Sequence, residues 1–165
     1  MVNYLWQIFL ILACSIPLVE ALEPGDKVPD FVMPSTNGAP QRLSEQLGNP
    51  VMLVWLNDCN ACAEKLIDWQ YLAESWAVEN LTTWFLWRKK ENYTAPWSRL
   101  PVLEYQASNT QAWWFEPSPA VMFIAPDGTL DYLFIDKVNM RKVEVANELK
   151  HWLKNKEWFK QEGNR

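Results

Sequence analysis

The stretch that decides the fold is Val51-Met52-Leu53-Val54-Trp55-Leu56-Asn57-Asp58-Cys59-Asn60-Ala61-Cys62. Its first six residues are apolar without alternation and follow the turn signal Asn49-Pro50, which predicts a strand buried on both faces, as in the middle of an α/β sheet. Asn57-Asp58 ends the apolar run, and from Cys59 to Glu79 apolar side chains recur at helical spacing. The two cysteines are therefore predicted to lie where a central strand passes into a helix.

Further elements on both sides of this stretch complete a compact α/β layout. Apolar runs of strand length occur at Leu81–Trp87, Ala120–Ala125 and Thr129–Ile135. Capping residues and helical spacing predict a short helix from Ser108 or Asn109 to about Phe115 and a long helix from Asn139 to about Lys156. Residues 22–48 form an irregular lead-in, with a hairpin-type turn at Asn37-Gly38 and one helical turn at Leu43–Gly48.

The spacing of Cys59 and Cys62 suits thiol-disulfide exchange. This chemistry needs a thiolate that attacks a disulfide and a second thiol that resolves the mixed disulfide. Two cysteines three positions apart on the first turn of a helix share a face, and the unpaired N–H groups of that turn stabilise negative charge on sulfur. We therefore predict Cys59 as the attacking nucleophile and Cys62 as the resolving thiol.

A zinc site is the alternative use of this cysteine spacing. Structural zinc takes four ligands, commonly from two such pairs or from added histidines. The chain has three cysteines and one histidine, His151, in the middle of the last predicted helix. The sequence thus favours redox chemistry with no metal and no cofactor, and we predict that His151 is an ordinary exposed helix residue.

Residues 1–21 have the layout of a signal peptide. The apolar stretch Tyr4–Val19 leads into Val19-Glu20-Ala21, a small-x-small cleavage site. An uncleaved membrane anchor and a lipoprotein modified at Cys14 remain alternatives. We predict a single exported domain at 22–165, periplasmic or secreted, which meets a membrane only if the first segment is retained. Without Cys14 the remaining cysteines close too short a loop to serve mainly as a structural disulfide.

The composition narrows the possible partners. The 165 residues carry a formal net charge of -5 and no basic patch interleaved with aromatic residues, which argues against nucleic-acid binding. Hydrophobic residues at 49% and charged residues at 21% are typical of a globular protein. The 11 tryptophans are a surplus that hints at a docking surface, with candidates at Trp97, Trp113, Trp114 and Trp158.

The chain resembles the thioredoxin-like thiol-disulfide oxidoreductases, and among them the exported TlpA-like and cytochrome c maturation (redoxin) branch. The resemblance covers nearly all of residues 22–165. Its motifs are Val28-Pro29-Asp30-Phe31, Leu43-Ser44, the strand ending near Trp55 before Cys59-Asn60-Ala61-Cys62, Leu100-Pro101-Val102-Leu103, Ser118-Pro119 and Asp127-Gly128. The resemblance implies an α/β, thioredoxin-like fold, in which a central mixed β-sheet is flanked by helices and carries an N-terminal extension.

The resemblance also implies roles for residues around the cysteines. Pro119 matches the family's cis-proline, which lies against the active-site disulfide, and it joins Cys59 and Cys62 as a catalytic position. Ser118, the preceding specificity position, and Trp55 are implied in substrate binding. The implied partners are thiol or disulfide client proteins, such as apocytochromes, and a membrane electron donor of the DsbD type. The family's direction of electron flow favours a reductant.

The chain departs from the family pattern close to the cysteines. Asp58 places a carboxylate before Cys59, which tends to raise the pKa of that thiol. Leu53 occupies a position, six residues before Cys59, that is often polar in the family and assists proton transfer. Lys65 and Ile67 stand where a glutamate and a proline are usual. Deprotonation of Cys62 would then rely on water or on another group such as Glu64.

Two other functions remain open. A peroxiredoxin-like antioxidant would share the fold, but that family uses a threonine three positions before its reactive cysteine, where this chain has Leu56. A Trp-rich binding module with an inert disulfide would depend on exposed tryptophans instead of thiols. Replacing Cys59 by serine separates a binding module from an oxidoreductase, because binding would survive the loss of the thiol.

Overall fold

The computed structural model describes residues 21–56, 62–76, 80–88, 94–95, 97–105, 119–135, 138 and 140–154. Residues 1–20 of the leader predicted at 1–21, and the predicted short helix near 108–115, lie outside these ranges, so both stay predictions. Among the residues that are described, no helix combines the length and the apolar character needed to cross a membrane.

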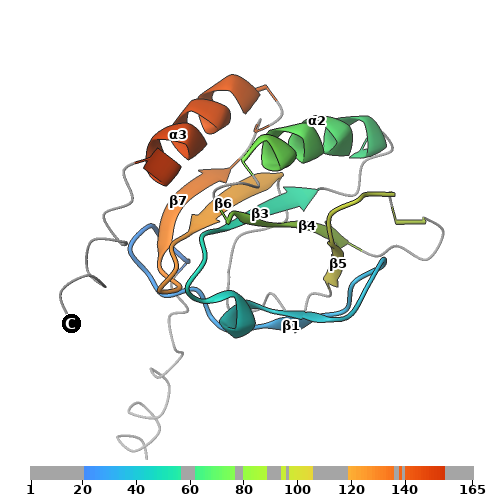
Figure 1. Ribbon diagram of the computed structural model, residues 1–165, viewed down its shortest axis with the longest axis horizontal. Coiled ribbons are helices and arrows are strands. Elements are labelled where there is room, and N and C mark those ends of the chain that lie inside the picture. The colour runs from blue at the N-terminus through green and yellow to red at the C-terminus, as the bar shows by residue number, and fades with distance from the viewer. Residues whose placement is uncertain are drawn as a thin grey trace, which may run out of the picture.

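A five-stranded mixed sheet forms the centre of the molecule (Figure 1). Its spatial order is β5-β4-β3-β6-β7, with β3 at Val51–Leu56, β4 at Thr82–Arg88, β5 at Val102–Tyr105, β6 at Ala120–Ile124 and β7 at Leu130–Ile135. Strands β3, β4 and β5 run parallel, whereas β6 is antiparallel to β3 and to β7. Every residue of β3 is buried, which confirms the prediction of a central strand.

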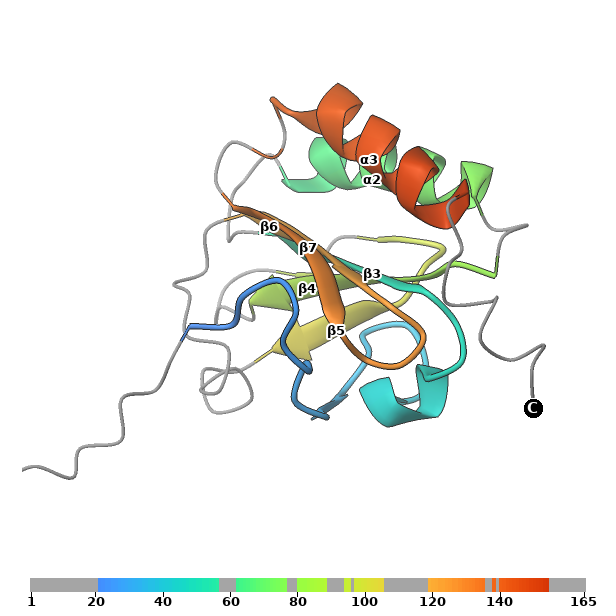
Figure 2. The same cartoon turned by 90° about the vertical axis from the view of Figure 1, so that its left-hand side faces the viewer.

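Two helices, α2 (Cys62–Ser75) and α3 (Lys142–Lys154), cover one face of this sheet (Figures 1 and 2). Their buried side chains share one apolar layer with the strands: Leu66, Trp69 and Ala73 from α2, and Val145, Leu149, Trp152 and Leu153 from α3. The indole of Trp152 stacks on Phe123 with centroids 5.2 Å apart and donates a hydrogen bond of 2.6 Å to the Asp131 carboxylate. An ion pair between Lys142 and Asp68 joins the two helices.

Residues 22–48, called the N-terminal segment below, cover the opposite face (Figure 1). They include β1 (Val32–Met33), β2 (Gln41–Arg42) and the 3-10 turn η1 (Leu43–Gln46). Phe31, Met33 and Leu43 are buried in a second apolar layer. On the sheet side this layer contains Leu53, Trp55, Trp84, Leu86, Leu103, Tyr105 and Met122. The predicted hairpin and helical turn are therefore confirmed, and together they cover this face of the sheet.

The N-terminal segment also pairs with both outer strands of the sheet. Next to β7, the amide of Leu130 donates to the Asp26 carbonyl at 2.8 Å and the amide of Gly25 donates to the Leu130 carbonyl at 2.8 Å. Next to β5, the amide of Glu104 donates to the Pro34 carbonyl at 2.9 Å. These bonds occupy edge groups that could otherwise pair with a second chain.

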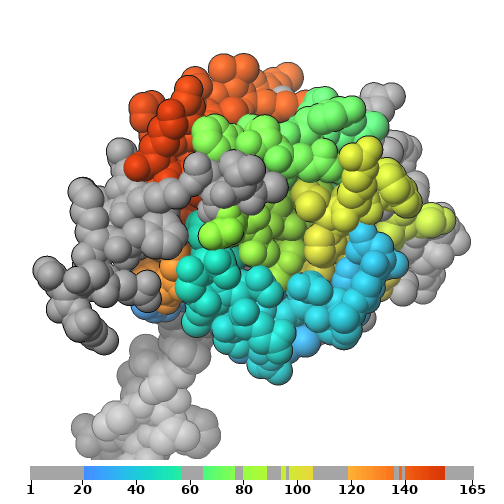
Figure 3. All heavy atoms as spheres, in the orientation of Figure 1, coloured from blue at the N-terminus to red at the C-terminus, as the bar shows by residue number. Residues whose placement is uncertain are grey.

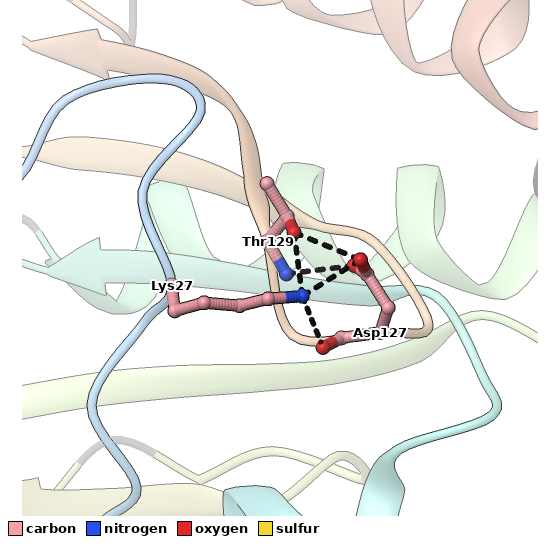
Figure 4. Close-up of polar contacts among 3 residues, drawn as sticks. All are labelled: Lys27, Asp127 and Thr129. Carbon is pink, nitrogen blue, oxygen red and sulfur yellow. Dashed lines mark hydrogen bonds and ion pairs between the residues drawn. The ribbon is translucent and has the colours of Figure 1, made fainter.

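A compact polar cluster fixes the segment at the β6–β7 turn (Figure 4). The Lys27 ammonium donates to the Asp127 carboxylate at 2.7 Å, to the Asp127 carbonyl at 2.8 Å and to the Thr129 hydroxyl at 2.9 Å. The Thr129 amide donates to the other Asp127 carboxylate oxygen at 2.9 Å. The hydrogen bond from Lys27 lowers the pKa of Asp127, which partial burial would otherwise raise.

Within the described residues, the predicted elements agree with the structure apart from one strand. The long helix that was expected from Cys59 is described from Cys62 onward, and the last helix begins at Lys142, three residues after the expected cap Asn139. Strand β5 was not predicted. This strand has four residues and directly follows Pro101, which suggested a turn in the sequence. In the structure it pairs with β4.

Candidate active site

The strand ends around the cysteine motif converge at one end of the sheet. Parallel strands β3, β4 and β5 all finish there, and the described part of α2 begins at Cys62, six residues after Leu56. Antiparallel β6 starts at the same end, because its first residue, Ala120, pairs with Trp55. Crevices beyond the carboxyl ends of parallel strands are common binding sites in α/β sheets.

Cys62 is the first residue of α2 that the structure describes, and its role as the resolving thiol stays a prediction. The first N–H groups of a helix have no partner within it, and they favour negative charge nearby. Cys59 and residues 57–61 lie outside the described ranges. The structure therefore places Cys62 on α2, and the position of Cys59 and its distance from Cys62 stay untested.

Pro119 is partly buried and directly precedes β6. Since Ala120 pairs with Trp55, Pro119 lies beside the last residues of β3, the strand that leads into the cysteine motif. Ser118 lies outside the described residues, and with it the Ser118–Pro119 peptide bond whose cis geometry the resemblance implies. The structure thus places Pro119 next to the strand pair of Ala120 and Trp55, while its role at the cysteines, the cis bond and the role of Ser118 stay predictions.

Trp55 lies beneath the site, in the layer shared with the N-terminal segment. Its side chain is only 2% exposed, so its predicted contact with substrate would need a change in the surrounding residues. The ring instead contacts Tyr105 of β5, with centroids 4.6 Å apart and planes at 60°. Tyr105 was not singled out from the sequence, because β5 itself was not predicted.

Two leucines near the motif restrict the chemistry. Leu53 is fully buried in the same layer as Trp55, so β3 supplies no acid or amide at the position where relatives often have one. Leu56 is 4% exposed and packs in the helix-side layer. It offers no hydroxyl for the activation of a peroxide-reactive thiol.

The motif Val28-Pro29-Asp30-Phe31 acts at a distance from the site. Asp30 accepts hydrogen bonds from the amide of Ser44 at 2.9 Å, from its hydroxyl at 3.0 Å and from Arg42 at 3.0 Å. Burial alone would raise the pKa of Asp30, but these bonds and the Arg42 charge outweigh it and lower the pKa. The motif therefore fastens the 3-10 turn η1 to the rest of the N-terminal segment.

Other residues noted in the sequence lie away from this end. His151 is exposed on α3, as predicted. Trp97 is 78% exposed, whereas Trp113, Trp114 and Trp158 lie outside the described ranges. Within those ranges, no three side chains of His, Cys, Asp or Glu are grouped as a metal ion would require.

No protein-family model matches the sequence, and no curated protein matches it either. Solved structures do match. The thioredoxin domain of a thiol-disulfide oxidoreductase from Bacteroides vulgatus aligns with a TM-score of 0.64 and 12% identity, over 81% of this chain and 99% of its own. A thiol:disulfide interchange protein from Bacteroides sp. gives 0.64 and 11%, over 84% and 95%. Peroxidoxin BcpB from Mycobacterium tuberculosis gives 0.64 and 17%, over 79% and 97%.

These neighbours are thiol-disulfide oxidoreductases and a peroxidoxin, and they share the arrangement described above. At such identities the likeness concerns the fold. The order of the five strands and the helix after β3 agree with it. The chain therefore has a thioredoxin-like fold, with a mixed sheet, flanking helices and an N-terminal extension.

Proposed function

We propose that the chain is an exported thiol-disulfide oxidoreductase that works through Cys59 and Cys62. The observation that carries this proposal is the meeting of three elements at one end of the sheet. Strand β3 ends there, the described part of α2 follows from Cys62, and Pro119 precedes β6 beside Trp55. The likeness to thiol-disulfide oxidoreductases supports the same interpretation, since those proteins have this fold.

The exchange proceeds in two steps. The Cys59 thiolate attacks one sulfur of a client disulfide, and a Cys59–client mixed disulfide forms while the other client sulfur leaves as a thiolate. The Cys62 thiolate then attacks Cys59, so that the Cys59–Cys62 disulfide forms and the second client thiolate is released. Two electrons pass to the client, which takes up two protons from water. A dithiol donor later returns the pair to its reduced form.

The surroundings of the motif define what each group contributes. The first turn of the helix predicted from Cys59 stabilises negative charge on the Cys59 sulfur, and Pro119 presents the backbone of the adjoining segment to an extended client. Because Leu53 is buried and supplies no acid, protons are exchanged with water or with Glu64. The clients are disulfide proteins outside the cytoplasm, such as apocytochromes, and the donor is a membrane protein of the DsbD type.

The first experiment measures the reduction potential of the Cys59/Cys62 pair after the protein is equilibrated with glutathione or dithiothreitol. A value near the thioredoxin end of the scale, about -270 mV, supports a reductant, whereas a value near -120 mV indicates a disulfide donor. Cys59→Ser should abolish exchange with a disulfide substrate, and Cys62→Ser should trap the mixed disulfide. An unreactive wild-type pair, or full exchange activity in Cys59→Ser, would contradict the proposal.

Partner docking through tryptophan is a second candidate, favoured by Trp97. This side chain is 78% exposed, yet the backbone next to it is held on two sides. Gln70 of α2 accepts hydrogen bonds from the Ser98 hydroxyl at 3.1 Å and the Arg99 amide at 3.2 Å, and Asn37 donates to the Ser98 carbonyl at 3.0 Å. Figure 3 shows this part of the chain in yellow, between α2 in green and the N-terminal segment in blue.

Tryptophan is enriched among binding hot spots, and Trp97 exposes its indole next to this hydrogen-bonded backbone. Pull-down of a client with the wild-type chain, Trp97→Ala and Cys59→Ser separates the two functions. Binding that depends on Trp97 and survives in Cys59→Ser favours docking as the main role. Reduction of added hydrogen peroxide by the wild-type chain would instead favour a peroxidase, which the apolar Leu56 argues against.

A further inference from the structure

Two aromatic side chains pack together at the end of the sheet that leads into the cysteine motif. The ring centroids of Trp55 and Tyr105 are 4.6 Å apart and the ring planes make an angle of 60°, an edge-to-face arrangement. Their side chains are 2% and 3% exposed. The indole nitrogen and the phenol oxygen are both buried as well, so this contact lies wholly inside the layer beneath the N-terminal segment.

The strand register places Tyr105 on the site side of Trp55. Strand β4 separates the two residues, and Leu86 of β4 lies level with both Trp55 and Leu103. Tyr105 follows Leu103 by two residues and is the last residue of β5. Its ring therefore covers Trp55 from the end of the sheet where the cysteine motif begins.

Trp55 is connected to both sides of the candidate site. Cys59 follows it by four residues, so their Cα atoms can be at most about 14 Å apart. On the other side, Ala120 pairs with Trp55 in the ladder between β3 and β6, and Pro119 is the next residue along. A shift of the indole would thus reach the cysteine loop and Pro119 through short connections.

We propose that Tyr105 is a positioning residue for thiol-disulfide exchange. Its ring holds the Trp55 indole, and thereby the end of β3 and the start of β6, in the arrangement that sets the redox equilibrium of Cys59 and Cys62. This inference rests on the proposed function. Because the contact between Tyr105 and Trp55 is one of ring against ring, Tyr105 acts through packing, and phenylalanine should replace it.

The test compares equilibrium constants of the Cys59/Cys62 couple against glutathione in the full chain, with the dithiol fraction measured by thiol alkylation and mass spectrometry. Tyr105→Met removes the ring but keeps most of its volume, and Tyr105→Phe keeps the ring. Tyr132→Met is the matched control, because the Tyr132 ring packs 5.6 Å from Phe123 in the opposite layer. Urea unfolding of each variant gives the accompanying loss of stability.

We expect Tyr105→Met to change the constant about threefold or more, while Tyr105→Phe and Tyr132→Met stay within about 1.5-fold of wild type. Should Tyr105→Met fail to fold, Trp55→Phe opens the contact from the other side and must shift the constant in its place. A constant unchanged in these variants, or changed equally by Tyr132→Met, overturns the role of Tyr105 alone. A wild-type chain without a reversible disulfide overturns the proposed function and this inference with it.

Discussion

Leu53 occupies the centre of β3, facing the layer beneath the N-terminal segment. Its side chain has no exposed surface, and its neighbours across the ladder are Trp84 and Met122. An acid at this position would have no charged partner among these apolar neighbours. Leucine at this position therefore stabilises the fold, but it cannot transfer protons as an acid could.

Leu53→Asp should lower the free energy of unfolding by roughly 3 kcal/mol or more at pH 7, because a buried carboxylate is left without compensation. Burial raises the pKa of the introduced group in the folded state above its unfolded value of about 3.9. The penalty is thus fully present at neutral pH and shrinks as the pH falls toward that unfolded value. Urea unfolding at pH 7 and pH 4 measures both effects.

Leu53→Met is the control for this change, since it keeps the volume and the apolar character and should cost less than about 1.5 kcal/mol. An aspartate variant as stable as the methionine variant at pH 7 would show that Leu53 has access to water or to a cation. Such a result would reopen acid-base assistance from β3.

At the scale of elements, the β6–β7 turn shows how one glycine fixes a connection. Gly128 has a φ of +86°, and a Cβ at this position would lie 3.3 Å from Cδ2 of Leu47. At Gly38, in the hairpin of the N-terminal segment, a Cβ would meet no atom within 4 Å, and the backbone has no such φ. The two glycines therefore differ in both backbone strain and available space.

Gly128→Ala should lower the free energy of unfolding by about 1 to 2 kcal/mol, because a left-handed conformation costs an L-residue that much. Gly38→Ala should change it by less than about 0.5 kcal/mol, as for an ordinary surface position. Thermal or urea unfolding of the two variants gives the comparison. Equal effects at both glycines would mean that the β6–β7 turn relaxes without cost.

Helices and strands with a clear apolar pattern could be predicted from the sequence, whereas a short strand could not. The run Val51–Leu56 was identifiable because six apolar residues in a row between turn signals favour a buried strand, and the cysteines located the helix that follows. β5 was missed because Pro101 suggested a turn and a four-residue strand carries little periodicity. The contact of Tyr105 with Trp55 was missed with it, since a contact between residues so far apart in the chain leaves no local pattern.

At the scale of the whole molecule, the N-terminal segment covers the sheet face opposite the helices and bonds to both edge strands, β5 and β7. The Lys27–Asp127 pair that fastens it is exposed, with side-chain exposures of 64% and 65%. Exposed pairs contribute little to global stability. Its effect should therefore be local, at the hydrogen bonds that tie the segment to the start of β7.

Lys27→Met should cost less than about 1 kcal/mol in global unfolding but speed hydrogen exchange at the amides of Val28 and Leu130, which bond across this junction. Lys150→Met, on the exposed side of α3, is the control and should leave these amides unchanged. Acid should act like Lys27→Met in the wild-type chain. Since the Lys27 hydrogen bond lowers the pKa of Asp127, its stabilisation is present above the unfolded pKa and is lost as the pH falls through the lowered value.

Exchange measured by NMR or mass spectrometry at pH 6 and below checks both parts. Faster exchange throughout the sheet, instead of at the junction alone, would mean that the N-terminal segment unfolds together with the core.

The separation of Lys27 from Asp127, 100 positions along the chain, also sets the order in which the molecule can be built. The contact of Lys27 with Asp127 can form only once β7 is available, whereas the bond of Glu104 to Pro34 needs only the earlier strand β5. Closing so long a loop costs little more than closing a shorter one, as the entropy grows only with the logarithm of length. The segment can therefore join the sheet first at β5 and last at β7, and the β7 edge is where its pairing groups are satisfied latest.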